Sequence, residues 1–107
     1  MSDEVLARLA ALIKSRRTAG ADQSYTRQLL AAGVERCAKK LGEEAIETVV
    51  AALAQDDAAL KNEAADLVYH LLVVLESRNV AFDDVVEVLA GRMGTSGLAE
   101  KAARGKS

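Results

Sequence analysis

Two long helical patterns joined by one short turn constrain the fold of this chain more than any other feature. Apolar residues recur at helical spacing from about Val34 to Ala54, and they cover most of the helix circumference from about Ala58 to Ser77. Gln55-Asp56-Asp57 lies between the two patterns as a turn, and either aspartate can cap the helix that follows. The sequence therefore predicts a central antiparallel helical hairpin.

Shorter helical segments flank this hairpin. Residues Ser2 to Arg17 begin with a Ser-Asp-Glu capping signal, and Tyr25 to Ala32 read as a short helix that ends at Gly33. A last helix opens at Asp83 or Asp84 and runs to about Ala90. The 107-residue chain has no proline, and its length suits one domain. We expect a single all-α domain over residues 1–107 with four to five helices and a flexible, Gly-rich, basic tail over residues 91–107.

The second half of the hairpin is too apolar for a helix that buries only one face. Its apolar residues surround the helix axis, so it must be buried on more than one side. In a chain of this size, that requirement points to a subunit interface. We therefore expect a homodimer, packed as a dimeric helical bundle. The residues concerned are Leu67, Val68, Leu71, Leu72, Val74 and Leu75.

The charge and cysteine content exclude several classes of function. The net charge of −2 argues against general affinity for nucleic acids or membranes, and no apolar stretch approaches the ~20 residues of a membrane span. The single cysteine, Cys37, rules out an intramolecular disulfide and reads as a core residue. The N-terminus reads as an amphipathic helix and not as a signal peptide. We expect a cytoplasmic protein.

Two pairs of acidic residues on the hairpin form the most informative motif. Glu44 and Glu47 are three residues apart, as are Glu63 and Asp66, so each pair shares one helix face. Glu47 lies about 12 Å along the helix axis before the turn, and Glu63 lies about 9 Å after it. In an antiparallel hairpin, the four carboxylates therefore stand at similar heights and can converge on one spot.

A divalent cation explains such a convergence better than solvated surface positions do. Residues 43–66 carry seven acidic groups and one basic group, Lys61, and Asp66 lies inside an apolar run where a charge needs a partner. Carboxylate ligands suit Mg²⁺, with Mn²⁺ as a possible substitute. A ferritin-like di-iron bundle would need Glu-x-x-His motifs, which the sequence lacks. The alternative, that both pairs are solvated helix faces, stays open at this point.

The motif and its surroundings resemble a known family. Glu43-Glu44-x-x-Glu47 followed by Glu63-x-x-Asp66 is similar to the signature of the all-α nucleotide pyrophosphohydrolase (MazG-like) superfamily. Ser24-Tyr25-Thr26, the segment from Lys39 to Glu47, the segment from Glu63 to Leu72 and the segment from Gly94 to Ala102 resemble the phosphoribosyl-ATP pyrophosphatase family of histidine biosynthesis. The resemblance covers nearly the whole chain, and its motifs are specific in combination.

The resemblance implies a reaction and a set of roles. The reaction is the Mg²⁺-dependent hydrolysis of phosphoribosyl-ATP to phosphoribosyl-AMP and pyrophosphate by a homodimer of helical hairpins. Glu44, Glu47, Glu63 and Asp66 would be the metal ligands by the family pattern. Glu43 would lie beside them, either supporting the ligands from outside or activating water, although its helix phase is offset from that of Glu44.

Several other side chains carry two interpretations each. Lys39 and Lys40 could pair with Glu43 and Glu44 one turn on, or reach the substrate phosphates. Further phosphate candidates, each also explicable as a solvated surface group, are Arg78, Arg92, Lys101 and Arg104. Ser24-Tyr25-Thr26 reads as a helix cap with a packed tyrosine or as a segment near the substrate. His70 could bond to Asp66 or simply pack.

Two rival functions remain open. The first is a housecleaning pyrophosphatase for noncanonical nucleotides, which would use the same fold and the same carboxylates. The second is a non-enzymatic helical dimerisation module with acidic surfaces, which predicts no effect of Mg²⁺ on the protein.

Overall fold

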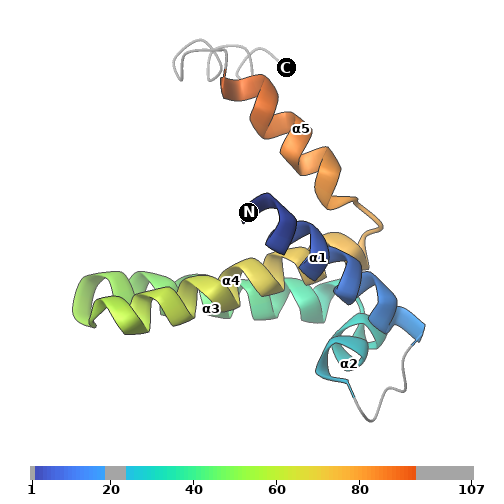
Figure 1. The fold of residues 1–107 in the computed structure, drawn as a ribbon. Helices are drawn as coiled ribbons and strands as arrows, with labels where there is room; N and C mark the ends of the chain where they lie inside the picture. The colour runs from blue at the N-terminus through green and yellow to red at the C-terminus, as the bar shows by residue number, and fades with distance from the viewer. Residues whose placement is uncertain (1, 19–23, 94–107) are drawn as a thin grey trace, which may run out of the picture.

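The computed structural model describes residues 2–18 and 24–93, and within these ranges it contains helices and no strand. Helix α1 (Ser2–Ser15) is extended by a 3₁₀ turn (Arg16–Thr18), and α2 (Tyr25–Ala32), α3 (Val34–Ala54), α4 (Asp57–Ser77) and α5 (Phe82–Met93) follow (Figure 1). The predicted all-α class is therefore confirmed. None of these helices is long and apolar enough to cross a membrane.

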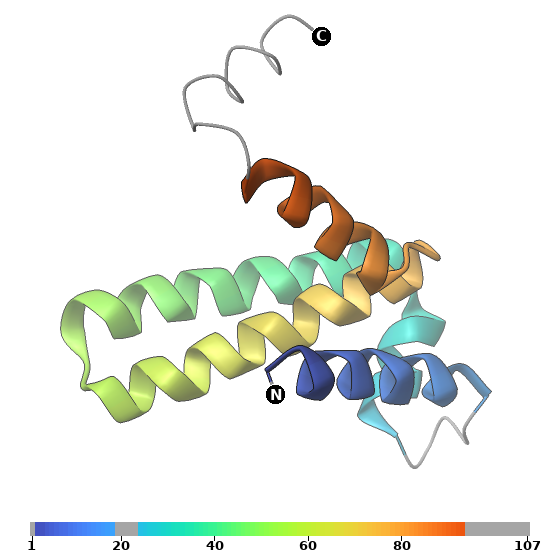
Figure 2. The same cartoon turned by 45° about the horizontal axis from the view of Figure 1, so that its top comes forward.

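Helices α3 and α4 form the predicted antiparallel hairpin, and they lie side by side in Figures 1 and 2. The sequence left open which aspartate caps α4, and the structure selects Asp56. Its Oδ1 accepts a hydrogen bond from the backbone N–H of Ala59 at 2.9 Å, and Asp57 becomes the first helical residue. At the other side of the turn, the backbone N–H of Gln55 donates to the carbonyl of Ala51 at 3.1 Å and closes α3.

The hydrophobic core lies at the end of the hairpin away from this turn. Its fully buried members come from four helices: Ile13 of α1, Leu29 of α2, Cys37 of α3, and Leu72 and Val73 of α4. Cys37 is 1% exposed, which confirms it as a core residue, and burial raises the pKa of its thiol.

Helix α2 is set between its neighbours by its two ends. The Ser24 hydroxyl caps its N-terminus by accepting from the backbone N–H of Arg27 at 3.1 Å. At its C-terminus, Gly33 has φ of +102°, a backbone conformation that residues other than glycine rarely adopt. The glycine therefore allows α3 to start directly after α2 in a new direction.

An ion pair fixes the end of α1 against the end of α4. The Arg17 guanidinium bonds to the carboxylate and backbone carbonyl of Glu76, and its Nη2 donates to Asn79 Oδ1 at 3.0 Å. Asn79 has φ of +59°, the left-handed conformation that terminates α4. These contacts hold the N-terminal helices on the open end of the hairpin.

Helix α5 departs from the prediction in its bounds and in its packing. It runs from Phe82 to Met93 and continues past Ala90, because Gly91 costs only about 1 kcal/mol inside a helix and does not stop it. It extends away from the hairpin (Figures 1 and 2) and leaves Val86, Leu89 and Met93 exposed. The predicted tail beyond Met93 lies outside the described residues.

Candidate metal centre

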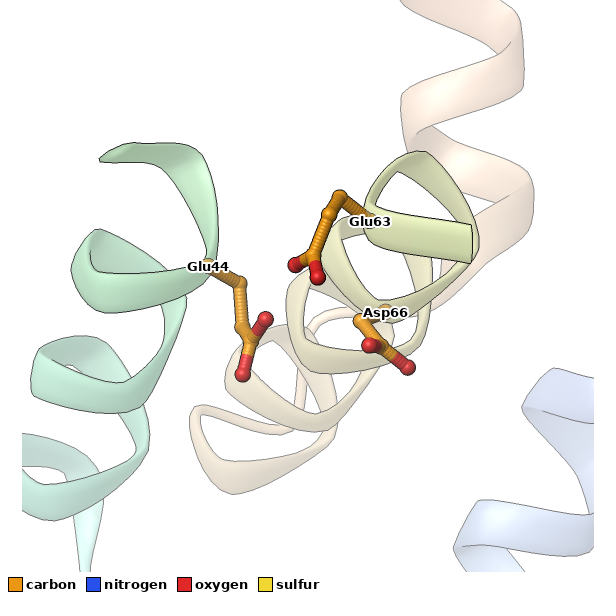
Figure 3. Close-up of side chains that lie close together, drawn as sticks. All are labelled: Glu44, Glu63 and Asp66. Carbon is orange, nitrogen blue, oxygen red and sulfur yellow. The ribbon is translucent and has the colours of Figure 1, made fainter. Parts of the chain in front are cut away.

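Three of the four predicted metal ligands meet between the two helices of the hairpin. Glu44 comes from α3, and Glu63 and Asp66 come from α4. One carboxylate oxygen of each lies within 4.8 Å of the others. Figure 3 shows the Glu44 side chain reaching from its helix toward the Glu63 and Asp66 side chains on the facing helix. The structure thus brings Glu44 of the first pair together with both members of the second pair, and Glu47 is not among the three residues whose oxygens meet.

Burial within this cluster differs from the expectation. The sequence singled out Asp66 as the carboxylate most in need of a partner, yet Asp66 is exposed and Glu44 is only 9% exposed. The reason is that the apolar run of α4 leaves the strip that carries Asp66 open, whereas Glu44 points into the helix–helix contact. Glu44 is therefore the buried member of the cluster, and Asp66 is the member that faces solvent.

Glu47, the fourth predicted ligand, adjoins Glu44. Burial is the main cause that raises the pKa of Glu44, and a hydrogen bond with Glu47 and the charge of that carboxylate raise it further. A shared proton or a cation would relieve the repulsion between these two carboxyl groups. Glu47 itself is exposed and contacts Glu44 without joining the group of three oxygens that meet.

Thr48 ties the two helices together at the level of the carboxylates. Its hydroxyl lies 2.8 Å from the backbone carbonyl of Glu44 and 3.2 Å from that of Glu63. The first contact is the local one expected of a helical threonine, and the second crosses to α4. The sequence does not reveal this role, because a threonine inside a helix carries no sign of which residue it contacts on a neighbouring helix.

The donor set suits a small divalent cation. All candidate ligand atoms are carboxylate oxygens, which is the chemistry that Mg²⁺ and Mn²⁺ prefer. Lys40, one helical turn before Glu44 on α3, pairs with a different carboxylate. Its Nζ lies 3.2 Å from Glu43 Oε1, and this bond is the main cause that raises the pKa of Lys40. Burial raises the pKa of Glu44, the charges of Glu47 and Asp66 raise it further, and the charge of His70 lowers it, so a cation at this point would stabilise the ionised carboxylate.

The same ion pair bears on both Lys40 and Glu43. Lys40 makes the intrahelical salt bridge, and the Glu43 carboxylate turns toward it, with the side chain 47% exposed. Lys39 is exposed on α3. Arg78 is the C-cap of α4, about 18 Å along the helix axis from Asp66, so this chain does not bring it to the carboxylates. Arg92 is in α5, and Lys101 and Arg104 lie outside the described residues.

Tyr25, Tyr69 and His70 form a cluster of rings beside the carboxylates. No sequence motif links these three residues. The His70 Nδ1 atom lies 2.8 Å from the backbone carbonyl of Asp66, and its Nε2 atom lies 3.3 Å from the Tyr25 hydroxyl. His70 therefore bonds to the backbone of Asp66 and not to its carboxylate. The hydroxyls of Thr26 and Tyr69 bond to each other beside it.

Comparison with known proteins agrees with this architecture. Residues 6–93 match the family described as phosphoribosyl-ATP pyrophosphohydrolase. A relative from Agrobacterium fabrum is 56% identical over 104 residues, which cover 97% of this chain and 97% of the relative. A relative from Cereibacter sphaeroides is 54% identical over 101 residues, covering 94% of this chain and 98% of the relative. A third, from Ruegeria pomeroyi, is 54% identical over 102 residues, covering 95% and 97%.

All three relatives are named phosphoribosyl-ATP pyrophosphatase. The match spans every described helix that contributes to the carboxylate cluster, and it reaches nearly end to end in each relative. The chain therefore belongs to the phosphoribosyl-ATP pyrophosphohydrolase family.

Proposed function

We propose that this protein hydrolyses phosphoribosyl-ATP to phosphoribosyl-AMP and pyrophosphate, an early step of histidine biosynthesis. The observation that carries the proposal is the carboxylate cluster of Glu44, Glu63 and Asp66 on the hairpin of a chain that belongs to this family. A cytoplasmic single-domain protein over residues 1–107 fits such a role.

The cluster has the composition that a phosphoanhydride hydrolase requires. Glu44, Glu47, Glu63 and Asp66 would hold Mg²⁺, with Mn²⁺ as a substitute, between α3 and α4. Bound there, Mg²⁺ would neutralise charge on the phosphate oxygens and would make a water molecule easier to deprotonate. Without that charge, the acidic cluster would repel a triphosphate, so the cation also makes binding of the substrate possible.

The reaction needs a group that accepts the proton of the attacking water. The water oxygen bonds to phosphorus, the proton passes to a carboxylate, and the P–O bond of the anhydride breaks with its electron pair on the departing phosphate oxygen. Glu43 is our candidate for this carboxylate, because it is next to Glu44 and is half-exposed to solvent. Its bond to Lys40 would hold it in place and would open when the substrate phosphates attract that ammonium group.

A homodimer is part of the proposal. One face of α3 is apolar and exposed to solvent in this chain. It is formed by Ile46, Val49, Val50 and Leu53, and Leu53 is 83% exposed. On α4, Val68 and Leu71 are also partly exposed. The Cα radius of gyration is 15.9 Å, above the about 13 Å of a compact 100-residue domain. A second copy of the chain, covering these faces, would complete the core.

A substrate panel tests the proposed activity. The purified protein should hydrolyse phosphoribosyl-ATP in the presence of Mg²⁺, release pyrophosphate and act poorly on dCTP and dUTP. Rapid hydrolysis of the deoxynucleotides with no action on phosphoribosyl-ATP would favour the housecleaning function. No hydrolysis of any nucleotide and no response to Mg²⁺ would favour the non-enzymatic dimerisation module.

A further inference from the structure

The chain gathers most of its ring side chains at one point beside the carboxylates. It has two tyrosines, one phenylalanine, one histidine and no tryptophan. Tyr25, Tyr69 and His70 lie together, with ring centroids 4.9 Å apart for Tyr69 and His70 and 6.1 Å apart for Tyr25 and His70. His70 is one helical turn from Asp66, or about 6 Å along the axis. The ring cluster therefore borders the metal centre.

Buried His70 fixes the direction of the Tyr25 hydroxyl. The backbone carbonyl of Asp66 can only accept, so the His70 Nδ1 atom 2.8 Å away carries the hydrogen. In the neutral ring the Nε2 atom then accepts, and the Tyr25 hydroxyl 3.3 Å away donates to it. His70 is 6% exposed, so its ring cannot easily turn aside. The histidine thereby ties the start of α2 to the turn of α4 that carries Asp66.

The part of Tyr25 that remains available to a ligand is its aromatic ring. Its hydroxyl hydrogen is used by His70, yet the residue is 50% exposed, and no other aromatic residue in the described ranges is as exposed. Tyr69 lies nearly parallel to it, with an interplanar angle of 22° and a centroid distance of 6.4 Å, and supports the ring from one side. The bonds from Tyr25 to His70 and from His70 to the backbone of Asp66 place the phenol next to the turn of α4 that carries Asp66.

We propose that Tyr25 contacts the substrate by stacking its ring on the purine base, and that His70 is the residue that positions it. The inference rests on the proposed function, because a nucleotide whose phosphates lie at Glu44, Glu63 and Asp66 must place its base beyond the cluster. An exposed, well-supported aromatic ring next to the phosphate site is the feature that a base can use. Tyr25 then favours nucleotides over smaller polyphosphates.

Kinetics of matched variants test the role of the ring. Tyr25→Leu keeps an apolar side chain and removes the π face, so the KM for phosphoribosyl-ATP should rise roughly 5- to 100-fold with kcat changed less than about 3-fold. Tyr25→Phe keeps the face and should stay much closer to wild type. Phe82→Leu removes an aromatic ring that packs against the core far from the carboxylates, and should leave the KM unchanged. A Tyr25→Leu variant with wild-type KM overturns the assignment.

Variants of His70 separate positioning from packing. His70→Leu removes the acceptor for the Tyr25 hydroxyl. Its KM for phosphoribosyl-ATP should rise above that of wild type, by the small increase expected for Tyr25→Phe or somewhat more. His70→Gln, whose amide oxygen can accept the same bond, should restore most of the affinity. Equal KM values for His70→Leu, His70→Gln and wild type would overturn the positioning role.

A binding measurement keeps this inference distinct from the proposed activity. With three Tyr and Phe residues in the chain, NMR of the aromatic side chains resolves Tyr25 by comparison with Tyr25→Phe. Titration with phosphoribosyl-AMP and Mg²⁺ should shift the Tyr25 ring signals strongly and those of Phe82 little. Absence of a shift at Tyr25 overturns the inference whether or not the wild type is active. Active wild type with an unmoved Tyr25 refutes the stacking alone, whereas inactive wild type refutes the proposed activity.

Discussion

The hydroxyl of Thr48 on α3 lies 3.2 Å from the backbone carbonyl of Glu63 on α4. This is a direct contact between the helix that carries Glu44 and the helix that carries Glu63 and Asp66. The opposing carboxylates repel one another when no cation is present. The Thr48 contact therefore helps to hold the helices at the separation that brings the acidic oxygens within 4.8 Å.

Removing this hydroxyl should weaken both the fold and the site. Thr48→Val keeps the branched shape and loses the contact, so the free energy of unfolding should fall by about 1 kcal/mol. The Mg²⁺ concentration needed for half-maximal activity should rise. Urea unfolding and Mg²⁺ titration of the turnover measure the two effects. Thr48→Ser retains the donor and serves as the control. A Thr48→Val protein as stable as wild type, with a less stable Thr48→Ser, would contradict this role.

Replacing Glu63 should separate activity from stability. Glu63→Gln removes one negative charge from the cluster, so turnover should be abolished while the metal-free protein stays as stable or gains a few tenths of a kcal/mol. Mg²⁺ at about 100 times its Kd should raise the Tm of the wild type by roughly 10 °C, and should have little effect on the variant. Calorimetry with and without Mg²⁺ measures these shifts. A large loss of metal-free stability would mean that Glu63 is structurally paired.

The buried carboxyl of Glu44 should make the metal-free protein sensitive to pH. Because its pKa is raised above the ordinary 4.5, the folded state holds this proton more tightly than the unfolded state. The stability that it contributes is full below about pH 4.5 and is lost as the pH rises through the raised pKa. Glu44→Gln should reduce this loss and be more stable than wild type at neutral pH.

Urea unfolding in metal-free buffers across this pH range provides the measurement for Glu44. The two proteins should converge in stability toward acid pH. If Glu44→Gln were instead less stable than wild type at neutral pH, the carboxylate would have a favourable partner in the folded chain, and the repulsion argument would be wrong.

The exposed face of α3 should determine the oligomeric state. Val49 lies in the middle of the apolar face formed with Ile46, Val50 and Leu53, and a charge there would be buried without a partner in a dimer. Val49→Glu should therefore shift the molar mass in light scattering from dimer toward monomer. Val49→Leu, which keeps this position apolar, should leave the dimer intact. A wild-type monomer would refute the proposed interface.

The sequence predicted the elements from α2 to α4 well because their boundaries have local chemical signals. Ser24 and Gly33 bound α2, and the Gln55-Asp56-Asp57 turn separates α3 from α4, as expected. Because the acidic pairs lie at similar distances from that turn, the sequence predicted that all four carboxylates would meet, and three of them, Glu44, Glu63 and Asp66, do so. These inferences need only helix geometry and turn chemistry.

Contacts between elements were predicted less well, because periodicity does not say what a face packs against. The apolar periodicity from Val34 to Ala54 predicted a helix but not which of its faces is covered: Val49 and Leu53 are exposed, and the buried positions include Glu44 and Ala51. Likewise, Tyr25 and His70 are 45 residues apart, and only the packing of α2 on the hairpin brings them together. Neither Thr48 nor the Tyr25–His70 pair has a motif that would reveal its partner.

The central claim is that the carboxylates of the hairpin hold a divalent cation. Anomalous diffraction from crystals grown with Mn²⁺ tests it most directly, because Mn²⁺ suits the same oxygen ligands as Mg²⁺ and can be located by its own scattering. We predict an anomalous peak between α3 and α4, within bonding distance of Glu44, Glu63 and Asp66. A peak only at other residues, or no peak at Mn²⁺ concentrations that support activity, would contradict this account.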